Sequence, residues 1–376
     1  MEKAFEKDSQ IINLLRFPLT FLVVMQHCRG EIAMSSEWES FTLTDLYYAF
    51  KILFSGGLSL IAVPAFFFIS GYLFFRHIGT FNAGIYKEKI RKRLRSLLVP
   101  FVLWNLVCIP LTCLVLYFEH YQLHPIQDIQ EYIGNIRWLH IFWDHTITFI
   151  HYPNLLGMKS IYVSPLLGTM WYVRDLIVMV VLSPIVYLFI QKTGKYGILL
   201  LTILFLLRIW PTITLSQLSV YFFSLGAFYS IRRKGFQAPI TVKAFAYIVT
   251  AGILSAFLLL GGSENSIGWQ LTPLFTLAGT FSVFFLTATL VDRRPDVQLP
   301  ALLGNSSFFV YALHIEFALP IGFLIAKTIT LHSTNPVVLI VRYFLTPVII
   351  YAICVSIYWM LRRFCPKVLS LFTGNR

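Results

Sequence analysis

The sequence predicts an all-α fold, a polytopic transmembrane helix bundle of about ten spans with both termini in the cytoplasm. The first observation behind this prediction is composition. Of 376 residues, 57% are hydrophobic and 12% are charged, and the mean hydropathy is +0.73. Ordinary soluble domains contain roughly a quarter charged residues, so this composition excludes a soluble globular protein. The other two observations are the length of the apolar runs and the placement of Lys and Arg between them.

Ten apolar runs are bounded by charged residues or by clusters of Gly, Pro and Asn, and each is a candidate membrane helix. They cover residues 11–28, 50–75, 97–118, 166–190, 196–210, 213–231, 243–260, 269–291, 305–326 and 337–361. Pro211 separates the short runs 196–210 and 213–231, which could form one broken helix or a re-entrant hairpin. Little length remains for a separate domain, so we expect a single integral-membrane domain over residues 1–376.

The Lys and Arg residues decide the orientation, since cytoplasmic loops collect positive charge. With the N-terminus inside, the inner segments hold 21 of the 30 Lys and Arg residues, the outer segments hold 6, and three lie within the spans. An odd number of spans would not reproduce this asymmetry, so both termini are predicted to be cytoplasmic. The formal net charge of +13 therefore reflects placement in a membrane, and a nucleic-acid partner is not expected.

One long outer segment, about residues 119–165, is rich in aromatic side chains. They include Trp138, Trp143, Tyr152 and Tyr162. One interpretation is an interfacial helix whose rings lie at the depth of the lipid headgroups. The other is a platform for an acceptor molecule, because aromatic faces stack against sugar rings.

Several ionisable side chains fall inside apolar runs, where a charge costs several kcal/mol, so each is a functional candidate. They are Arg16, His27, Arg174, Asp175, His314, Glu316 and Arg342. The carboxylates of Asp175 and Glu316 would neutralise two of the arginines, which is the structural alternative. Arg342 lies near the outer end of its helix and can extend to the interface.

The first apolar run contains the most informative spacing, Arg16 followed eleven residues later by His27. Eleven residues at about 100° each return to nearly the same helix face, and they separate the two side chains by roughly 16 Å. Pro18 between them should kink or loosen the helix. Arg16 near the cytoplasm and His27 near the outer surface would form a stripe that can hold a long, thin, anionic molecule.

A basic inner loop precedes the third run, with Arg91, Lys92, Arg93 and Arg95 in the stretch KEKIRKRLRSLLVP. This cluster could serve only to retain the loop in the cytoplasm and attract anionic membrane lipids. It could instead bind phosphate, because guanidinium groups match phosphate oxygens and two arginines at i and i+2 could hold one group from two sides.

Five stretches stand out in order along the chain. They are RFPLTFLVVMQH at 16–27, VPAFFFISGYLFF at 63–75, RKRLRSLLVPFVLW at 91–104, GTMWYVRDLIVMVVLSP at 168–184 and GNSSFFVYALHIEF at 304–317. An Arg with a His eleven residues later, a Phe-rich Ser-Gly turn, a basic loop before a Pro and a final Ser, Tyr and His together resemble the acyltransferase-3 family of membrane acyltransferases. The resemblance covers both ends of the chain.

This resemblance implies a reaction and a place for it. An acyl group, most often acetyl, would pass from cytoplasmic acyl-coenzyme A to a hydroxyl of an extracytoplasmic glycan or lipid-linked sugar, in a bacterial inner membrane. His27 would be the essential base or the acyl carrier, and Arg16 would support the donor. Arg91 and Arg93, and in our prediction Arg95 as well, would hold the coenzyme phosphates.

The remaining candidates complete a predicted site. Asp175 or Glu316 could orient the His27 imidazole by accepting its other ring proton. The acceptor should meet Trp171, Tyr172, Arg174 and His314, although His314 could equally be a second proton relay or a packing residue. Ser70 and Gly71 should allow close helix approach and supply no nucleophile. The five cysteines lack metal-ligand spacing, and no metal is expected.

A transporter or flippase for a glycolipid or polysaccharide precursor is the alternative from another functional class. Buried Arg, Asp, His and Glu side chains also line substrate paths in such proteins. Against this alternative, the sequence shows no internal repeat and no paired helices broken by Gly and Pro.

Overall fold

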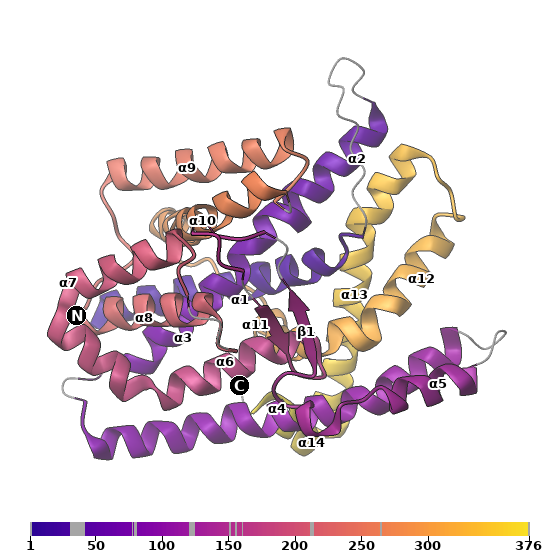
Figure 1. Cartoon of the computed structure of the whole chain (residues 1–376), viewed down its shortest axis with the longest axis horizontal. Helices are drawn as coiled ribbons and strands as arrows, with labels where there is room; N and C mark the ends of the chain where they lie inside the picture. The colour runs from indigo at the N-terminus through magenta and orange to yellow at the C-terminus, as the bar shows by residue number, and fades with distance from the viewer. Residues whose placement is uncertain are drawn as a thin grey trace.

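The computed structural model describes residues 2–30, 42–76, 78, 81–119, 125–149, 152–154, 156–159, 161–210, 214–263 and 265–374. Almost all of its regular structure is helical (Figure 1). The α-helices are α1 (Glu2–His27), α2 (Leu43–Lys51), α3 (Ala62–Phe75), α4 (Ala83–Glu119), α5 (Pro125–Gly134), α6 (Trp171–Val181), α7 (Ser183–Leu206), α8 (Gln217–Ile231), α9 (Ile240–Leu259), α10 (Ser266–Arg293), α11 (Ala301–Leu313), α12 (Leu319–Ile329), α13 (Pro336–Phe364) and α14 (Pro366–Thr373). The shorter elements are η2 (Ile52–Gly57), η3 (Leu58–Ile61), η4 (Trp138–His140), η5 (Gly168–Met170), η6 (His314–Ala318), β1 (Thr146–Phe149) and β2 (Ile161–Ser164).

Within the described residues, 8 helical segments are long and apolar enough to cross a membrane. They are Glu6–His27, Leu43–Phe75, Ala83–Phe118, Ser183–Leu206, Ile240–Leu259, Ser266–Arg293, Ala301–Ile329 and Pro336–Phe364. The all-α, multi-span class predicted from the sequence is therefore confirmed, and the chain is an integral membrane protein. The number of ten spans and the cytoplasmic side of both termini remain predictions.

Three of the ten predicted runs form different helices from those expected. The run at 196–210 is the second part of α7, after a break in helical geometry at Gly194. The run at 166–190 is divided between α6 and α7. Pro184 lies in the first turn of α7, a position that favours proline, and a new helix therefore begins there instead of a continuation of α6. The run at 213–231 becomes α8, which has 15 residues and is shorter than a usual span. Pro211, on which the prediction of a broken helix or hairpin depended, lies outside the described residues.

The basic segment predicted as an inner loop is helical. It forms the first turns of α4, a helix of 37 residues that runs along the lower edge of the molecule in Figure 1. The helix starts where the Asn82 side chain accepts a hydrogen bond from the amide of Ile85 at 3.0 Å, as an N-cap residue does. Its helical form places each basic side chain on a defined face, which a loop would not do.

Helices α3 and α8 cross in close contact at two glycines. A Cβ atom on Gly71 would lie 2.1 Å from the Phe223 carbonyl oxygen, and one on Gly226 would lie 2.0 Å from the Phe68 carbonyl oxygen. Only glycine lets the two backbones approach so closely. The sequence-based interpretation of Gly71 as a site of helix approach is therefore confirmed, and fully buried Phe side chains from both helices pack around the crossing.

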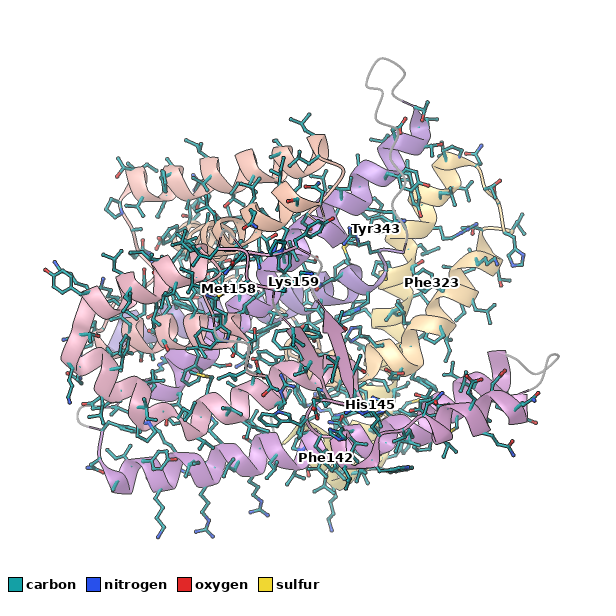
Figure 2. All side chains as sticks on the ribbon, in the orientation of Figure 1. Phe142, His145, Met158, Lys159, Phe323 and Tyr343 are labelled. Atoms are coloured by element: carbon teal, nitrogen blue, oxygen red, sulfur yellow. The ribbon has the colours of Figure 1, made fainter. Side chains whose placement is uncertain are left out.

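The aromatic segment at 119–165 forms α5 and a two-stranded antiparallel ribbon. Strands β1 and β2 pair with Thr146 opposite Ser164 and Phe149 opposite Ile161. Figure 2 shows Phe142 and His145 at the base of this ribbon beside α4, and the rings of Phe101 and Phe142 lie 6.1 Å apart. This contact attaches the ribbon to α4, and α6 follows the ribbon in the sequence.

The C-terminal end of α1 is held by a polar chain of contacts. The Ser55 hydroxyl in η2 donates to the Met25 carbonyl and also bonds the Tyr343 hydroxyl of α13 at 2.6 Å. Figure 2 shows Tyr343 on α13, close to α2. Three segments far apart in the sequence therefore fix the position of the last turn of α1, which contains His27.

Candidate active site

Two histidine rings meet where α1 ends. The ring centroids of His27 and His314 lie 5.2 Å apart, with 52° between the ring planes. His27 is exposed, whereas His314 is fully buried in the π-helical turn η6. Such turns often occur at functional sites, because the extra residue redirects a side chain. The pair therefore presents one accessible imidazole supported by one enclosed imidazole.

The hydrogen bonds of His314 define its tautomer. Its Nδ1 lies 2.8 Å from the Tyr311 carbonyl and 3.2 Å from the Val310 carbonyl, so Nδ1 must carry the proton. In the neutral ring Nε2 then has a lone pair, and this buried atom has no hydrogen-bonding partner within the described residues. The ring of His27 packs against this imidazole. An acceptor beside a histidine fixes its tautomer, as a carboxylate does in a triad, and the lone pair of His314 Nε2 is an acceptor that the structure offers near His27.

A cavity of about 320 Å³ lies beside α1, and two arginines line it. We call it the central cavity. Arg16 of α1 and Arg93 of α4 both line it, and they are close enough for their charges to interact. Neither arginine forms an ion pair with a carboxylate in the described part of the chain. Two like charges without a counter-charge favour an anionic ligand between them. The rest of the lining includes Ser70, Tyr172, Asn305, Ser307, Phe308 and Tyr311.

The central cavity shares its lining with a basic groove of about 500 Å³ beside the first turns of α4. Leu73, Phe74 and Arg93 line both spaces. Lys89 and Lys92 add positive charge to the groove. Arg93 therefore stands at the junction of the two spaces, where it can contact a ligand that extends from the groove into the cavity.

Arg91 and Arg95 are placed differently from Arg93. Both are exposed, and they line an open groove that shares Glu88 and Lys92 with the basic groove but does not reach the central cavity. Residues two apart on an α-helix point about 200° away from each other, so Arg91 and Arg93 cannot hold one phosphate group from two sides as the sequence analysis suggested. The structure brings Arg16 and Arg93 together at the central cavity, and Arg91 and Arg95 do not line that cavity.

Arg174 and Asp175 form a buried ion pair. Nε and Nη2 of Arg174 donate to Asp175 Oδ1 at 3.0 and 2.7 Å, and the other carboxylate oxygen accepts from the Ser216 amide at 2.9 Å. The same guanidinium donates to the carbonyl oxygens of Trp143, Val163 and Thr214. The structure therefore gives Asp175 partners other than His27, and this ion pair joins α6 to the aromatic ribbon and to the start of α8.

Glu316 also turns away from the histidine pair. Its carboxylate accepts a hydrogen bond from Thr112 of α4 at 3.2 Å, although it lies only two positions from His314 in η6. The predicted neutralisation of Arg16 by a buried carboxylate is not found among the described residues. The place expected for Asp175 or Glu316, beside the imidazole of His27, is taken by His314.

Two adjacent residues of α6 face different spaces. Tyr172 lines the central cavity and bonds the Ser70 hydroxyl at 3.1 Å, whereas Trp171 lines a second cavity beside β2 and α10. Helix α6 therefore contributes side chains to both cavities. Of the predicted substrate-binding residues, only Tyr172 lies at the central cavity.

Sequence reasoning gave no role to Lys89, and it noted Tyr311 only as the Tyr of a family-like stretch. Tyr311 lines the central cavity one turn before His314 in α11, and its hydroxyl donates to the Thr169 carbonyl. The signal was present, since a spacing of three residues places Tyr311 and His314 on one helix face. Lys89 could have been found in the same way, four residues before Arg93.

A family model for an acyltransferase domain matches residues 10–359, which include both histidines and both cavity arginines. The chain belongs to the acyltransferase-3 family. The succinoglycan biosynthesis protein ExoH of Rhizobium meliloti (strain 1021) is 24% identical over 376 residues, an alignment that covers 97% of this chain and 92% of that protein. No solved structure matches the chain. The family assignment shows an O-acyltransferase within a multi-span membrane protein, and it favours the predicted enzyme over the transporter.

Proposed function

We propose that this acyltransferase transfers a short acyl group, acetyl in the first instance, from cytoplasmic acyl-coenzyme A to a hydroxyl of an extracytoplasmic polysaccharide or lipid-linked sugar. The single observation that supports this proposal most directly is the pair Arg16 and Arg93, two cations without a carboxylate partner among the described residues, in a cavity that continues from a basic groove. A polysaccharide acceptor is also suggested by the similarity to a protein of succinoglycan biosynthesis. The membrane would be a bacterial inner membrane.

The donor fits this arrangement by charge and by length. Coenzyme A has its phosphates at one end and its thioester at the end of a thin arm. We place the phosphates in the basic groove at Lys89 and Arg93, and the arm in the central cavity past Arg16. Residues 16 and 27 of a continuous helix are separated by about 16 Å along its axis, a distance that an extended arm can cover.

The transfer step needs a base at the thioester. In our proposal His27 takes the proton of the acceptor hydroxyl, the oxygen forms a bond to the acyl carbon, and the carbon–sulfur bond breaks to release coenzyme A as a thiolate. His314 accepts the other ring proton of His27 as a hydrogen bond and keeps the reactive nitrogen unprotonated. A route through an acyl-histidine at His27 uses the same residues and the same products.

The test is incubation of the purified protein, in detergent, with radiolabelled acetyl-coenzyme A and a polysaccharide acceptor. The wild-type protein should release free thiol and label the acceptor. His27→Ala should reduce transfer by at least 10²-fold, the usual contribution of a general base, while membrane insertion is retained. The matched control is His332→Ala, since His332 is an exposed histidine in a turn after α12.

An active His27→Ala protein would refute the mechanism. Parallel reactions with succinyl-coenzyme A would identify the acyl group, because the preferred donor should have the higher kcat/KM. A wild-type protein that neither releases thiol nor labels itself or an acceptor with either donor would overturn the proposed function.

A further inference from the structure

A second cavity, of about 300 Å³, lies on the opposite side of α6 from the central cavity. We call it the tryptophan pocket. It is formed by β2, the first turn of α6, the end of α7, residues 208–210 and 214–218, and the first turns of α10. Its lining includes Tyr162, Trp171, Arg208, Trp210 and Trp269. None of these belongs to the central cavity.

Aromatic rings form the walls of this pocket. The rings of Tyr162 and Trp171 meet edge to face at 5.7 Å, and Trp210 is held by a hydrogen bond from its indole N–H to the Leu215 carbonyl at 2.9 Å. Flat indole faces fixed in this way offer apolar contact to the C–H face of a sugar ring without losing side-chain entropy on binding. A pocket with rigid aromatic walls and few polar groups is a usual ligand site.

Arg208 is the charged group of the pocket. Its guanidinium lies over the Trp269 ring, 3.6 Å from the centroid, and its Nη2 donates to the Trp269 carbonyl at 2.6 Å. Its Nε is buried without a hydrogen-bonding partner among the described residues, and none of the described carboxylates pairs with this cation. Burial lowers the pKa of Arg208 to about 9, because a charge without a counter-ion is poorly solvated there.

The backbone of Arg208 marks the end of α7. Its φ of 53° lies in the left-handed region, which is uncommon for a residue other than glycine. This residue ends α7 in a Schellman motif, with the Ile209 amide bonded to the Leu204 carbonyl, and Arg233 after α8 and His332 after α12 have nearly the same φ. The observation that points to a ligand is therefore the unpaired cation. Arg174 in the same pocket shows the contrast, since Asp175 neutralises it fully.

We propose that the tryptophan pocket binds a sugar residue that carries a negatively charged group, with the ring against the tryptophans and the carboxylate or phosphate at Arg208. This inference rests on the proposed function in one respect, because it names the chemical class of the acceptor. The anionic group could belong to an acidic sugar of a polymer or to the phosphate of a lipid-linked sugar. Both present anionic oxygens to the same guanidinium.

The experiment is titration of the purified protein by calorimetry, without an acyl donor, with four probes. These are glucuronate, glucose 1-phosphate, methyl glucoside and inorganic phosphate. Glucuronate or glucose 1-phosphate should bind at least about tenfold more tightly than methyl glucoside, the effect of a hydrogen bond to a charged group. The tighter of the two identifies the source of the anion. If inorganic phosphate binds as tightly as glucose 1-phosphate, the pocket does not recognise the sugar ring, and the proposal is wrong. If methyl glucoside binds as tightly as the anionic sugars, the pocket does not recognise the anionic group, and the proposal is equally wrong.

Arg208→Gly should remove the preference for the anionic sugars. Glycine adopts a positive φ without strain, so this variant should fold at least as well as the wild type, and thermal unfolding followed by tryptophan fluorescence checks that it does. Arg342→Gln is the matched control, because Arg342 bonds Thr330 and Ser333 at the far side of α13 and should not alter the titrations. Unchanged anionic-sugar binding by Arg208→Gly would refute the proposal.

The failure of this inference can be told apart from failure of the proposed function. His27→Ala should still bind the anionic sugar while transfer is lost. If the protein binds anionic sugars but never transfers an acyl group, the proposal for the tryptophan pocket stands and the proposed function is wrong. If it transfers an acyl group but binds no anionic probe, the proposed function stands and the proposal for the pocket is wrong.

Discussion

Arg93 and Arg95 are two residues apart in α4, yet their side chains lie in different surroundings. Arg93 stands at the junction of the basic groove and the central cavity, and Arg95 is exposed on another face. We predict that Arg93→Ala raises the Kd for acyl-coenzyme A by about tenfold to a hundredfold, the value of a hydrogen bond to a charged group. Arg95→Ala should change it by less than about twofold, as exposed charges usually do. Equal losses in the two variants would show that the segment acts through its total charge.

At the same scale, the proposed role of His314 depends on one lone pair. His314→Leu removes the acceptor at Nε2, and we expect kcat for acyl transfer to fall by about 10²-fold or more while the Kd for acyl-coenzyme A is unchanged. His314→Gln offers an acceptor oxygen and should restore part of the rate. A purely structural role predicts otherwise, namely that both variants lose protein stability together and that glutamine gives no recovery of kcat.

At the scale of elements, the crossing of α3 and α8 depends on two glycines. In Gly71→Ala the new Cβ would meet the backbone of Phe223, which cannot move like a flexible side chain. We expect this substitution to lower the free energy of unfolding by about 1–3 kcal/mol, the usual cost of overpacking. Gly252→Ala in α9 is the control, since its Cβ meets no atom within 4 Å, and it should be neutral or stabilising. Thermal unfolding in detergent measures both, and a Gly71→Ala protein as stable as Gly252→Ala would contradict the close packing.

Helix α6 shows why the site could be predicted only in part. The sequence grouped Trp171, Tyr172 and Arg174 as substrate-binding residues because they are adjacent in one stretch. Adjacent residues on a helix point about 100° apart, so Tyr172 reaches the central cavity while Trp171 reaches the tryptophan pocket. The guanidinium of Arg174 is bound in its ion pair with Asp175. The direction of each side chain depends on which helices surround α6, and that information is not local.

At the scale of the whole molecule, the distribution of Lys and Arg predicts both termini in the cytoplasm. The chain offers a direct test, since its cysteines are free and Cys365 after α13 is exposed. A thiol reagent that cannot cross membranes should label Cys365 in inside-out vesicles and leave it unlabelled in intact spheroplasts. Leu139→Cys together with Cys365→Ser should show the opposite pattern, since Leu139 is 97% exposed in the aromatic segment. Labelling of Cys365 in spheroplasts would invert the predicted topology.

The sequence alone determined the membrane class and the helical architecture, and it predicted Arg16 and His27 as the two ends of the donor path. Hydropathy adds up residue by residue, and the spacing of Arg16 and His27 lies within one helix, so both can be read without knowledge of other segments. The tertiary structure alone decided that His314 is the neighbour of His27, that Asp175 is bound to Arg174, and that Arg208 enters an aromatic pocket. Each of these depends on which distant helices pack together, because a buried polar group takes whichever partner the packing brings within hydrogen-bond distance.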